Sequence, residues 1–252
     1  NIKKIFGFDM MLFNKFLKNN YFRILRNFFF LKPTFSNYPY NSYSTISDFF
    51  FWREEEEFNT KFMLTNLSSQ IFPERNEGDN VQFIIFDKNG LLIKELKIKL
   101  NPFETKEIYF SSLNVNGYGS FFAFHYFESL QTIINSNSFI AERGYVGYKS
   151  NNGVWNFMHG NKFASYINKK RKLKSIEAST FRNLSYMPQV SFDDCKKAYI
   201  ILNNPSNAPI KYKLLSFDEK NHLFNKKIEN VPKLGTIVSR LESETKYLKL
   251  SS

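Results

Sequence analysis

The sequence predicts an all-β protein made of two tandem immunoglobulin-like antiparallel β-sandwich units, preceded by an amphipathic α-helix. After Ser47 the chain consists of short apolar runs rich in Phe, Ile and Val, separated by Gly, Asn, Ser and Pro. These runs recur with a spacing of about 130 residues, which indicates duplication of a domain-sized unit. No helix-length segment separates the strands, and this disfavours a parallel α/β sheet and its nucleotide sites.

Length and composition limit the class of protein. The chain has 252 residues, of which 42% are hydrophobic and 18% aromatic, so it is too apolar to be disordered. Its single cysteine, Cys195, excludes an internal disulfide, a cysteine zinc site and an iron–sulfur cluster. We therefore expect a folded protein of one or two domains, without a cofactor.

The repeat is clearest at two predicted hairpins. Residues 86–92 and 217–223 each combine a strand end, a tight turn and a new strand. The offset between the copies changes from 138 to 131 residues because the loop at 70–80 is longer in the first copy. The predicted organisation is a basic amphipathic helical segment and linker (1–47), a first sandwich (48–165) with an extra hairpin (139–161), a polybasic linker (166–175) and a second, shorter sandwich (176–252).

The positive charge is concentrated in two segments. The net charge is +12; residues 1–47 contribute +6, residues 161–175 contribute another +6, and the remainder is neutral. A nucleic-acid-binding domain usually carries basic residues across its folded surface, so this charge distribution disfavours nucleic acid as a partner. Two local basic segments fit an anionic membrane surface or another polyanion better.

The amino-terminal segment predicts an amphipathic helix over residues 10–31, where apolar residues recur at three- and four-residue steps. Charges interrupt the run, so the helix is too polar to cross a bilayer. It either lies in the headgroup region at the cytoplasmic face of a membrane or packs against the folded body. The expected membrane contacts are Phe13, Lys15, Leu17, Lys18, Tyr21, Arg23, Ile24, Arg26 and Phe28. The basic run at 169–174 is either a second membrane contact or a solvated linker.

The densest polar chemistry lies in the extra hairpin. If Ser150 faces Gly153, the ladder places Tyr148 opposite Trp155 and Gly144 opposite His159. Glu142 would then face Asn161 at the same end. The candidate ligand-binding residues are Glu142, Arg143, Tyr145, Tyr148, Trp155, His159 and Asn161.

Several interpretations of this segment stay open. Glu142 and Arg143 fit either a ligand site or a surface ion pair. A metal would need His125 and His159 to join Glu142, which the spacing permits but does not favour. Trp52, Tyr145, Tyr148 and Trp155 would form a flat aromatic surface for sugar rings if all four share an exposed face.

The function expected from these features is non-catalytic binding. We expect a peripheral membrane protein that recognises a carbohydrate or a protein partner through the extra hairpin. The alternative is an enzyme, a hydrolase or isomerase acting on a sugar-like substrate, with His159 and Glu142 as its acid–base pair. A structural subunit of a larger assembly and a nucleic-acid-binding protein rank below these two.

Overall fold

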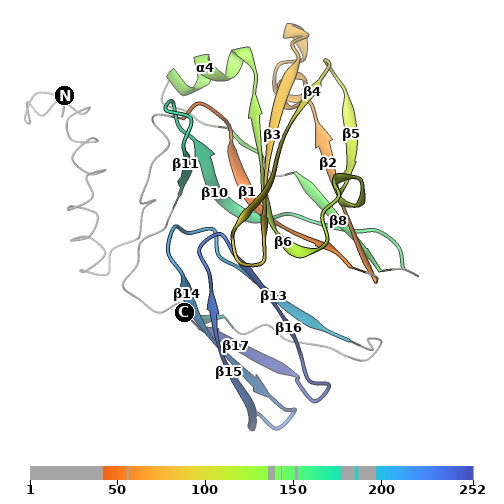
Figure 1. The fold of residues 1–252 in the computed structure, drawn as a ribbon, viewed down its shortest axis with the longest axis vertical. Helices are drawn as coiled ribbons and strands as arrows, with labels where there is room; N and C mark the ends of the chain where they lie inside the picture. Colours follow the sequence, from red (N-terminus) through yellow and green to blue (C-terminus); the bar gives the residue numbers. More distant parts are fainter. Residues whose placement is uncertain are drawn as a thin grey trace, which may run out of the picture.

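The computed structural model describes residues 42–55, 57–135, 140–142, 144–150, 153–176, 185–186 and 197–251, without the side chains of residues 142, 161–163, 185 and 186. Most of these residues lie in strands, and the sheets are almost wholly antiparallel, as the all-β class requires (Figure 1). The predicted helix over residues 10–31 lies outside the described residues.

One large sheet forms the first layer of the amino-terminal unit, which is residues 42–176. Its strand order is β11-β10-β1-β6-β3-β4, and a short strand, β7, pairs parallel to β1. The apolar residues on both faces of β6 predict a central strand, and β6 does lie between β1 and β3. The strands are β1 (Ile46–Glu54), β3 (Asp79–Asp87), β4 (Leu92–Leu100), β6 (Gly117–Tyr126), β7 (Ala141–Glu142), β10 (Asn161–Ile167) and β11 (Leu173–Ser175).

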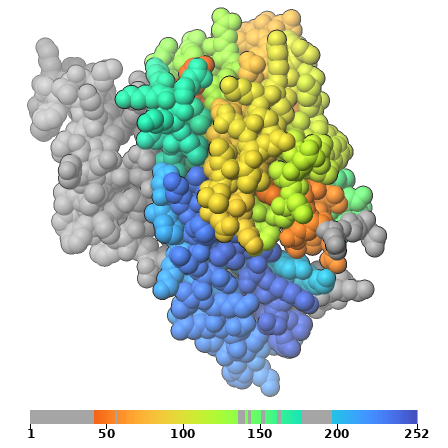
Figure 2. All heavy atoms as spheres, viewed as in Figure 1, coloured from red at the N-terminus to blue at the C-terminus, as the bar shows by residue number. Residues whose placement is uncertain are grey.

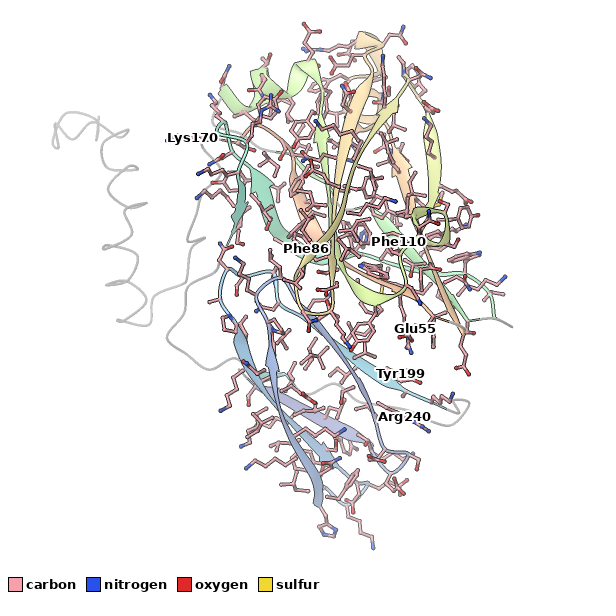
Figure 3. All side chains as sticks on the ribbon, in the orientation of Figure 1. Glu55, Phe86, Phe110, Lys170, Tyr199 and Arg240 are labelled. Atoms are coloured by element: carbon pink, nitrogen blue, oxygen red, sulfur yellow. The ribbon has the colours of Figure 1, made fainter. Side chains whose placement is uncertain are left out.

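A second sheet, of order β5-β2-β8-β9, packs against the first. Its strands are β2 (Phe58–Thr65), β5 (Thr105–Tyr109), β8 (Tyr145–Ser150) and β9 (Asn156–Met158). Trp52, Phe62 and Phe121 are buried in the core between the sheets, and the Trp52 ring stacks at 5.8 Å on Phe110, which Figure 3 labels. The indole Nε1 of Trp52 donates to the carbonyl of Phe86 at 2.9 Å, so burial leaves no unpaired donor there.

Short helical segments connect these strands. They are α3 (Leu67–Ile71), η2 (Pro73–Arg75), η3 (Phe110–Leu113) and α4 (Glu128–Asn135). α4, which buries Leu130 and Ile134 on one face, was not predicted from the sequence. Leu130 and Ile134 are four positions apart, as on one face of a helix, but α4 has only eight residues, which is too short for a periodic pattern to stand out.

The carboxy-terminal unit, described over residues 185–186 and 197–251, also consists of two antiparallel sheets. One sheet has the order β12-β17-β14-β15, and β13 pairs with β16 in the other. These strands are β12 (Ser185–Tyr186), β13 (Tyr199–Asn203), β14 (Ile210–Phe217), β15 (Leu223–Val231), β16 (Thr236–Arg240) and β17 (Tyr247–Ser251). β12, β17, β14 and β15 follow one another as β1, β6, β3 and β4 do in the first unit.

Both predicted hairpins are present and have the same turn geometry. The carboxylate of Asp87 accepts from the backbone N–H groups two and four residues later, at 2.9 and 2.8 Å. Asp218 accepts from the corresponding N–H groups at 2.8 Å each. In each turn one residue adopts a positive φ, Gly90 at 77° and Asn221 at 61°. Glycine and asparagine tolerate this left-handed conformation best.

The predicted linker over 166–175 is wrong, because these residues form the end of β10, a tight turn and β11. The Asn168 side chain accepts from the N–H groups of Lys170 and Lys172 at 3.0 and 2.9 Å. Asn168 therefore closes the turn as Asp87 and Asp218 close theirs. The basic residues occupy exposed turn positions, so their charge does not oppose hairpin formation.

The two units share part of one core. Figure 2 shows their surfaces in contact. Leu234, in the turn before β16, packs with Phe86 and Phe122 on the outer face of the first sheet. Its carbonyl accepts from Ser120 Oγ at 2.8 Å, and the Thr236 N–H donates to the carbonyl of Lys88 at 3.0 Å. These contacts fix the second unit against the end of the first.

Candidate functional site

The extra hairpin exists over β8 and β9, but its register differs from the prediction by one residue. Tyr148 lies opposite Asn156, not Trp155, and Gly147 lies opposite Phe157. A shift of one residue moves every side chain of a strand to the other face. Tyr148 therefore points into the core, where its hydroxyl donates to the carbonyl of Phe51 at 2.8 Å, while Trp155 lies on the outer face.

The outer face of the β5-β2-β8-β9 sheet carries a row of paired residues. The ladder places Tyr109 beside Lys61, Lys61 beside Gly147, and Gly147 beside Phe157. Trp155 lies just before β9, and its ring and that of Phe157 both lie beside Lys61 Nζ, so the two rings share this face. We call Tyr109, Tyr145, Trp155, Phe157 and His159 the aromatic face.

Gly147 makes room for the aromatic face. A Cβ atom at this position would lie 2.7 Å from the Phe157 ring, closer than side-chain packing permits. The missing side chain lets Phe157 lie over β8 and beside Lys61, whose Nζ is 5.5 Å from the ring centroid. A glycine within a strand often marks such a close approach.

A charged network lies among these rings. Lys61 Nζ is 2.7 Å from Glu107 Oε1 and 4.7 Å from the centroid of the Trp155 ring. The Tyr109 hydroxyl donates to the other carboxylate oxygen of Glu107. The hydrogen bond to Glu107 raises the pKa of Lys61, and hydrogen bonds from Lys61 and Tyr109 lower the pKa of Glu107. All three groups are thus held in one charge state near neutral pH.

A second aromatic pair extends this face. The rings of Tyr145 and His159 lie 4.4 Å apart, and Tyr145 is 52% exposed. Phe157 is 45% exposed, and Tyr109 and Trp155 meet edge to face at 6.0 Å. The surface therefore presents aromatic rings to solvent around a buried ammonium and its carboxylate partner.

The structure separates the other predicted site residues. Trp52 is buried in the core and takes no part in an exposed surface. The backbone of Glu142 pairs with Ser47, and that of Asn161 pairs with Phe49, so both belong to the other sheet. The side chains of Glu142 and Asn161, and all of Arg143, lie outside the described residues.

The three residues considered for a metal have different surroundings. His125 is fully buried, with Nδ1 2.6 Å from Asp79 Oδ2, whereas His159 is exposed beside Tyr145. Among the side chains that the structure describes, no group of three or more His, Cys, Asp or Glu is placed to hold a metal ion. Asp79 also accepts from the N–H of Leu67 at 3.1 Å, which ties the pair to the start of α3.

Sequence reasoning missed Lys61, Glu107, Tyr109 and Phe157. Three of them lie on β2 and β5, which reach the hairpin only through sheet pairing. Gly147, flanked by Val146 and Tyr148 within a strand, was the available signal for a large neighbour.

The carboxy-terminal unit has a basic surface that the net charge of its segment does not reveal. On the outer face of its larger sheet, Lys213 lies opposite Ile228, and Leu215 lies opposite both Lys226 and Lys249. Lys211 is two residues before Lys213 on the same face. We call Lys211, Lys213, Lys226 and Lys249 the lysine face; Ile228, 55% exposed, lies among them.

The predicted membrane contacts between Phe13 and Phe28 lie outside the described residues. Over the part of the chain that the structure covers, no helix is long and apolar enough to span a bilayer. Lys169, Lys170 and Lys172 are exposed in the turn between β10 and β11, and Figure 3 labels Lys170 there.

Comparisons with known proteins identify no relative of this chain. No family model matches the chain, and searches of curated proteins and of solved structures find no match.

Proposed function

We propose that the protein is a non-catalytic β-sandwich protein that binds a carbohydrate on the aromatic face. The observation that carries this proposal is the arrangement of Tyr109, Trp155 and Phe157 around Lys61 on the outside of one sheet. Exposed aromatic rings stack on the apolar faces of sugar rings, and nearby charged groups hydrogen-bond to hydroxyls. Glu107 and Lys61 are placed to do so.

The test is binding to a glycan array, followed by titration of a retained glycan. We expect Trp155→Ala and Phe157→Ala each to weaken binding at least tenfold. Gly147→Ala should do the same, because its methyl group displaces the Phe157 ring. Phe224→Ala is the matched control, since Phe224 is an exposed aromatic residue on the other unit. Retention of no glycan, or equal binding by all variants, would refute the proposal.

We also propose that the units are two copies of one immunoglobulin-like module, and that an amphipathic helix precedes them. The matching turns at Asp87 and Asp218 and the shared strand order support a duplication. The helix remains a prediction from the spacing of residues 10–31.

The lysine face supports the proposal that the protein attaches peripherally to the cytoplasmic side of an anionic membrane. Each lysine near such a surface contributes about 1 kcal/mol, and an exposed apolar residue such as Ile228 favours the interface. Co-sedimentation with phosphatidylserine vesicles should fall in Lys211→Gln/Lys213→Gln. The control Lys99→Gln/Lys220→Gln, with the same net charge, should bind as the wild type does. Equal binding to neutral vesicles would contradict the proposal.

The enzyme alternative depends on Glu142, whose side chain lies outside the described residues. It remains a hypothesis. Retention of unmodified glycan during the array experiment argues against it, and release of a shortened or isomerised sugar would support it.

A further inference from the structure

Arg171 occupies a position that glycine and asparagine occupy in the two matching turns. Its φ is 58°, in the left-handed region, where Gly90 and Asn221 also lie. Arg171 donates its N–H to the carbonyl of Asn168 at 2.8 Å, as Gly90 donates to that of Asp87 at 3.0 Å. A long side chain with a Cβ is unfavourable there, so the fold holds arginine where a smaller residue fits better.

The strained backbone directs the Arg171 side chain onto Tyr43. Its guanidinium carbon lies 3.3 Å from the centroid of the Tyr43 ring. The Tyr43 ring packs against Tyr126 at 5.2 Å, and the Tyr126 hydroxyl donates to Gln82 Oε1 at 2.5 Å. Stacking therefore holds the guanidinium over the Tyr43 ring.

A groove lies beside this arginine, between the β10–β11 hairpin and the outer face of β3 and β4. Its volume is about 420 Å³. The residues that line it are Gln82, Ile84, Glu95, Lys97, Ile167, Arg171 and Leu173. A second cavity of about 390 Å³ is lined by Tyr43 and Tyr126, which adjoin Arg171 and Gln82. The two cavities are thus neighbours on one face of the sheet.

The charges in the groove favour an anionic ligand. Arg171 and Lys97 are cationic, and Glu95 is the one acid among the lining residues. The Glu95 carboxylate accepts from Gln82 Nε2 at 2.8 Å, so part of its hydrogen-bonding capacity is already used. Burial raises the pKa of Tyr126, so its phenol stays neutral and adds no negative charge.

The uncharged lining favours a saccharide over a bare anion. Gln82 offers a neutral amide held in place by Tyr126 and Glu95, and Ile84, Ile167 and Leu173 offer apolar contact. A fixed guanidinium binds a planar carboxylate through two parallel hydrogen bonds. We propose that this groove binds the carboxylate of an acidic sugar, with Arg171 and Lys97 as the cationic contacts. The proposal takes its ligand class from the proposed carbohydrate binding, but it concerns a different sheet and different residues.

The test compares trigalacturonate with its fully methyl-esterified form by isothermal titration calorimetry on the full chain. The two probes share ring structure and length, and the ester lacks the charge. We expect the wild type to bind the acid at least tenfold more tightly than the ester. Arg171→Gly should remove this difference, with an unchanged or higher Tm, because glycine suits the left-handed position. A merely structural arginine would give a lower Tm and unchanged affinity.

Controls separate this groove from the aromatic face and from a simple anion site. Lys170→Gln removes a charge from the same turn without lining the groove, and should leave the preference for the acid intact. Trp155→Ala should weaken binding on the aromatic face but keep the acid preference that depends on Arg171. Equal binding of acid and ester by the wild type would overturn the proposal. Displacement of trigalacturonate by inorganic phosphate at equal concentration would also overturn it, by showing a site for any anion.

Discussion

Asn66 and Asn204, 138 positions apart in the sequence, make corresponding hydrogen bonds in the two units. The N–H of Asn66 donates to the carbonyl of Glu104 at 2.9 Å, and that of Asn204 to Gly235 at 3.0 Å. Each side-chain amide donates to a carbonyl at the start of the next turn, of Asn101 or of Pro232, at 2.9 Å. Both residues are fully buried, and each joins the two sheets of its unit.

We expect Asn66→Ala and Asn204→Ala each to lower the free energy of unfolding by about 2–3 kcal/mol. Each change leaves buried carbonyl groups without a hydrogen-bond donor. The free-energy cost of removing these groups from water is then no longer offset by a hydrogen bond. Urea denaturation monitored by circular dichroism measures the effect. Asn89→Ala, in an exposed turn, is the control and should change stability by less than about 0.5 kcal/mol. A similar small effect at Asn66 would contradict the structural role.

Gly90 and Asn221 have the same turn conformation but different neighbours. A Cβ atom at Gly90 would lie 2.0 Å from the carbonyl oxygen of Lys233 in the second unit. Gly90→Asn keeps a residue that tolerates the positive φ, so its cost measures the clash with that backbone. We expect a loss of about 2 kcal/mol or more, because a backbone atom must move. Asn221→Gly should be nearly neutral in the same thermal denaturation.

Leu234 and Phe103 occupy corresponding turn positions with opposite exposure. Their φ values are 56° and 61°, yet Leu234 is 5% exposed and Phe103 is 62% exposed. Leu234→Asn should destabilise the protein by about 3 kcal/mol, because it places a polar amide in the shared core. Phe103→Asn should change stability by less than about 0.5 kcal/mol. Equal effects in differential scanning calorimetry would show that the units do not share a core.

The Lys61–Glu107 pair predicts how the aromatic face responds to pH. The pKa of Glu107 is lowered in the folded state, so ionised Glu107 stabilises the fold. This stabilisation is fully present above the unfolded-state pKa of about 4.3 and is lost as pH falls through the folded-state pKa. The pKa of Lys61 is raised in the folded state, so protonated Lys61 also stabilises the fold. This stabilisation is fully present below the unfolded-state pKa of about 10.4 and is lost as pH rises through the folded-state pKa. The ion pair between Lys61 and Glu107, beside Trp155, is therefore fully formed in the pH range between these two values.

Trp155 fluorescence reports this pair directly. We expect its emission to change in acid as Glu107 is protonated and releases Lys61. Glu107→Gln should show the acid-like emission at neutral pH and no further change on acidification. Measuring both in a Trp52→Phe background removes the signal of the buried indole. An identical acid transition in Glu107→Gln would assign it to another group.

Local patterns determined what the sequence could predict. The hairpins at Asp87 and Asp218 were predictable because an aspartate and a left-handed residue three positions later specify the turn within five residues. The central place of β6 followed from apolar residues on both of its faces. The matching turn at Asn168 was missed because the lysines around it indicated a solvated linker.

The candidate site was predicted only in part because register and sheet pairing are not local. One additional residue in the loop between β8 and β9 moves Tyr148 inside and Trp155 outside. Tyr145, Trp155 and His159 were predicted as site residues and lie on the aromatic face. Lys61 and Tyr109 join them from strands that no motif links to the hairpin.

The insertion of Leu234 also bears on the order of events during synthesis. The apolar surface that receives it is built from Phe49, Ile84, Phe124, Ala164 and Ile167, all of which precede Leu234 in the chain. Domains generally fold as units, amino-terminal first, as the ribosome extends the polypeptide. The receiving surface is therefore complete before the residue that fills it leaves the ribosome, and the earlier unit serves as a template on which the later one closes.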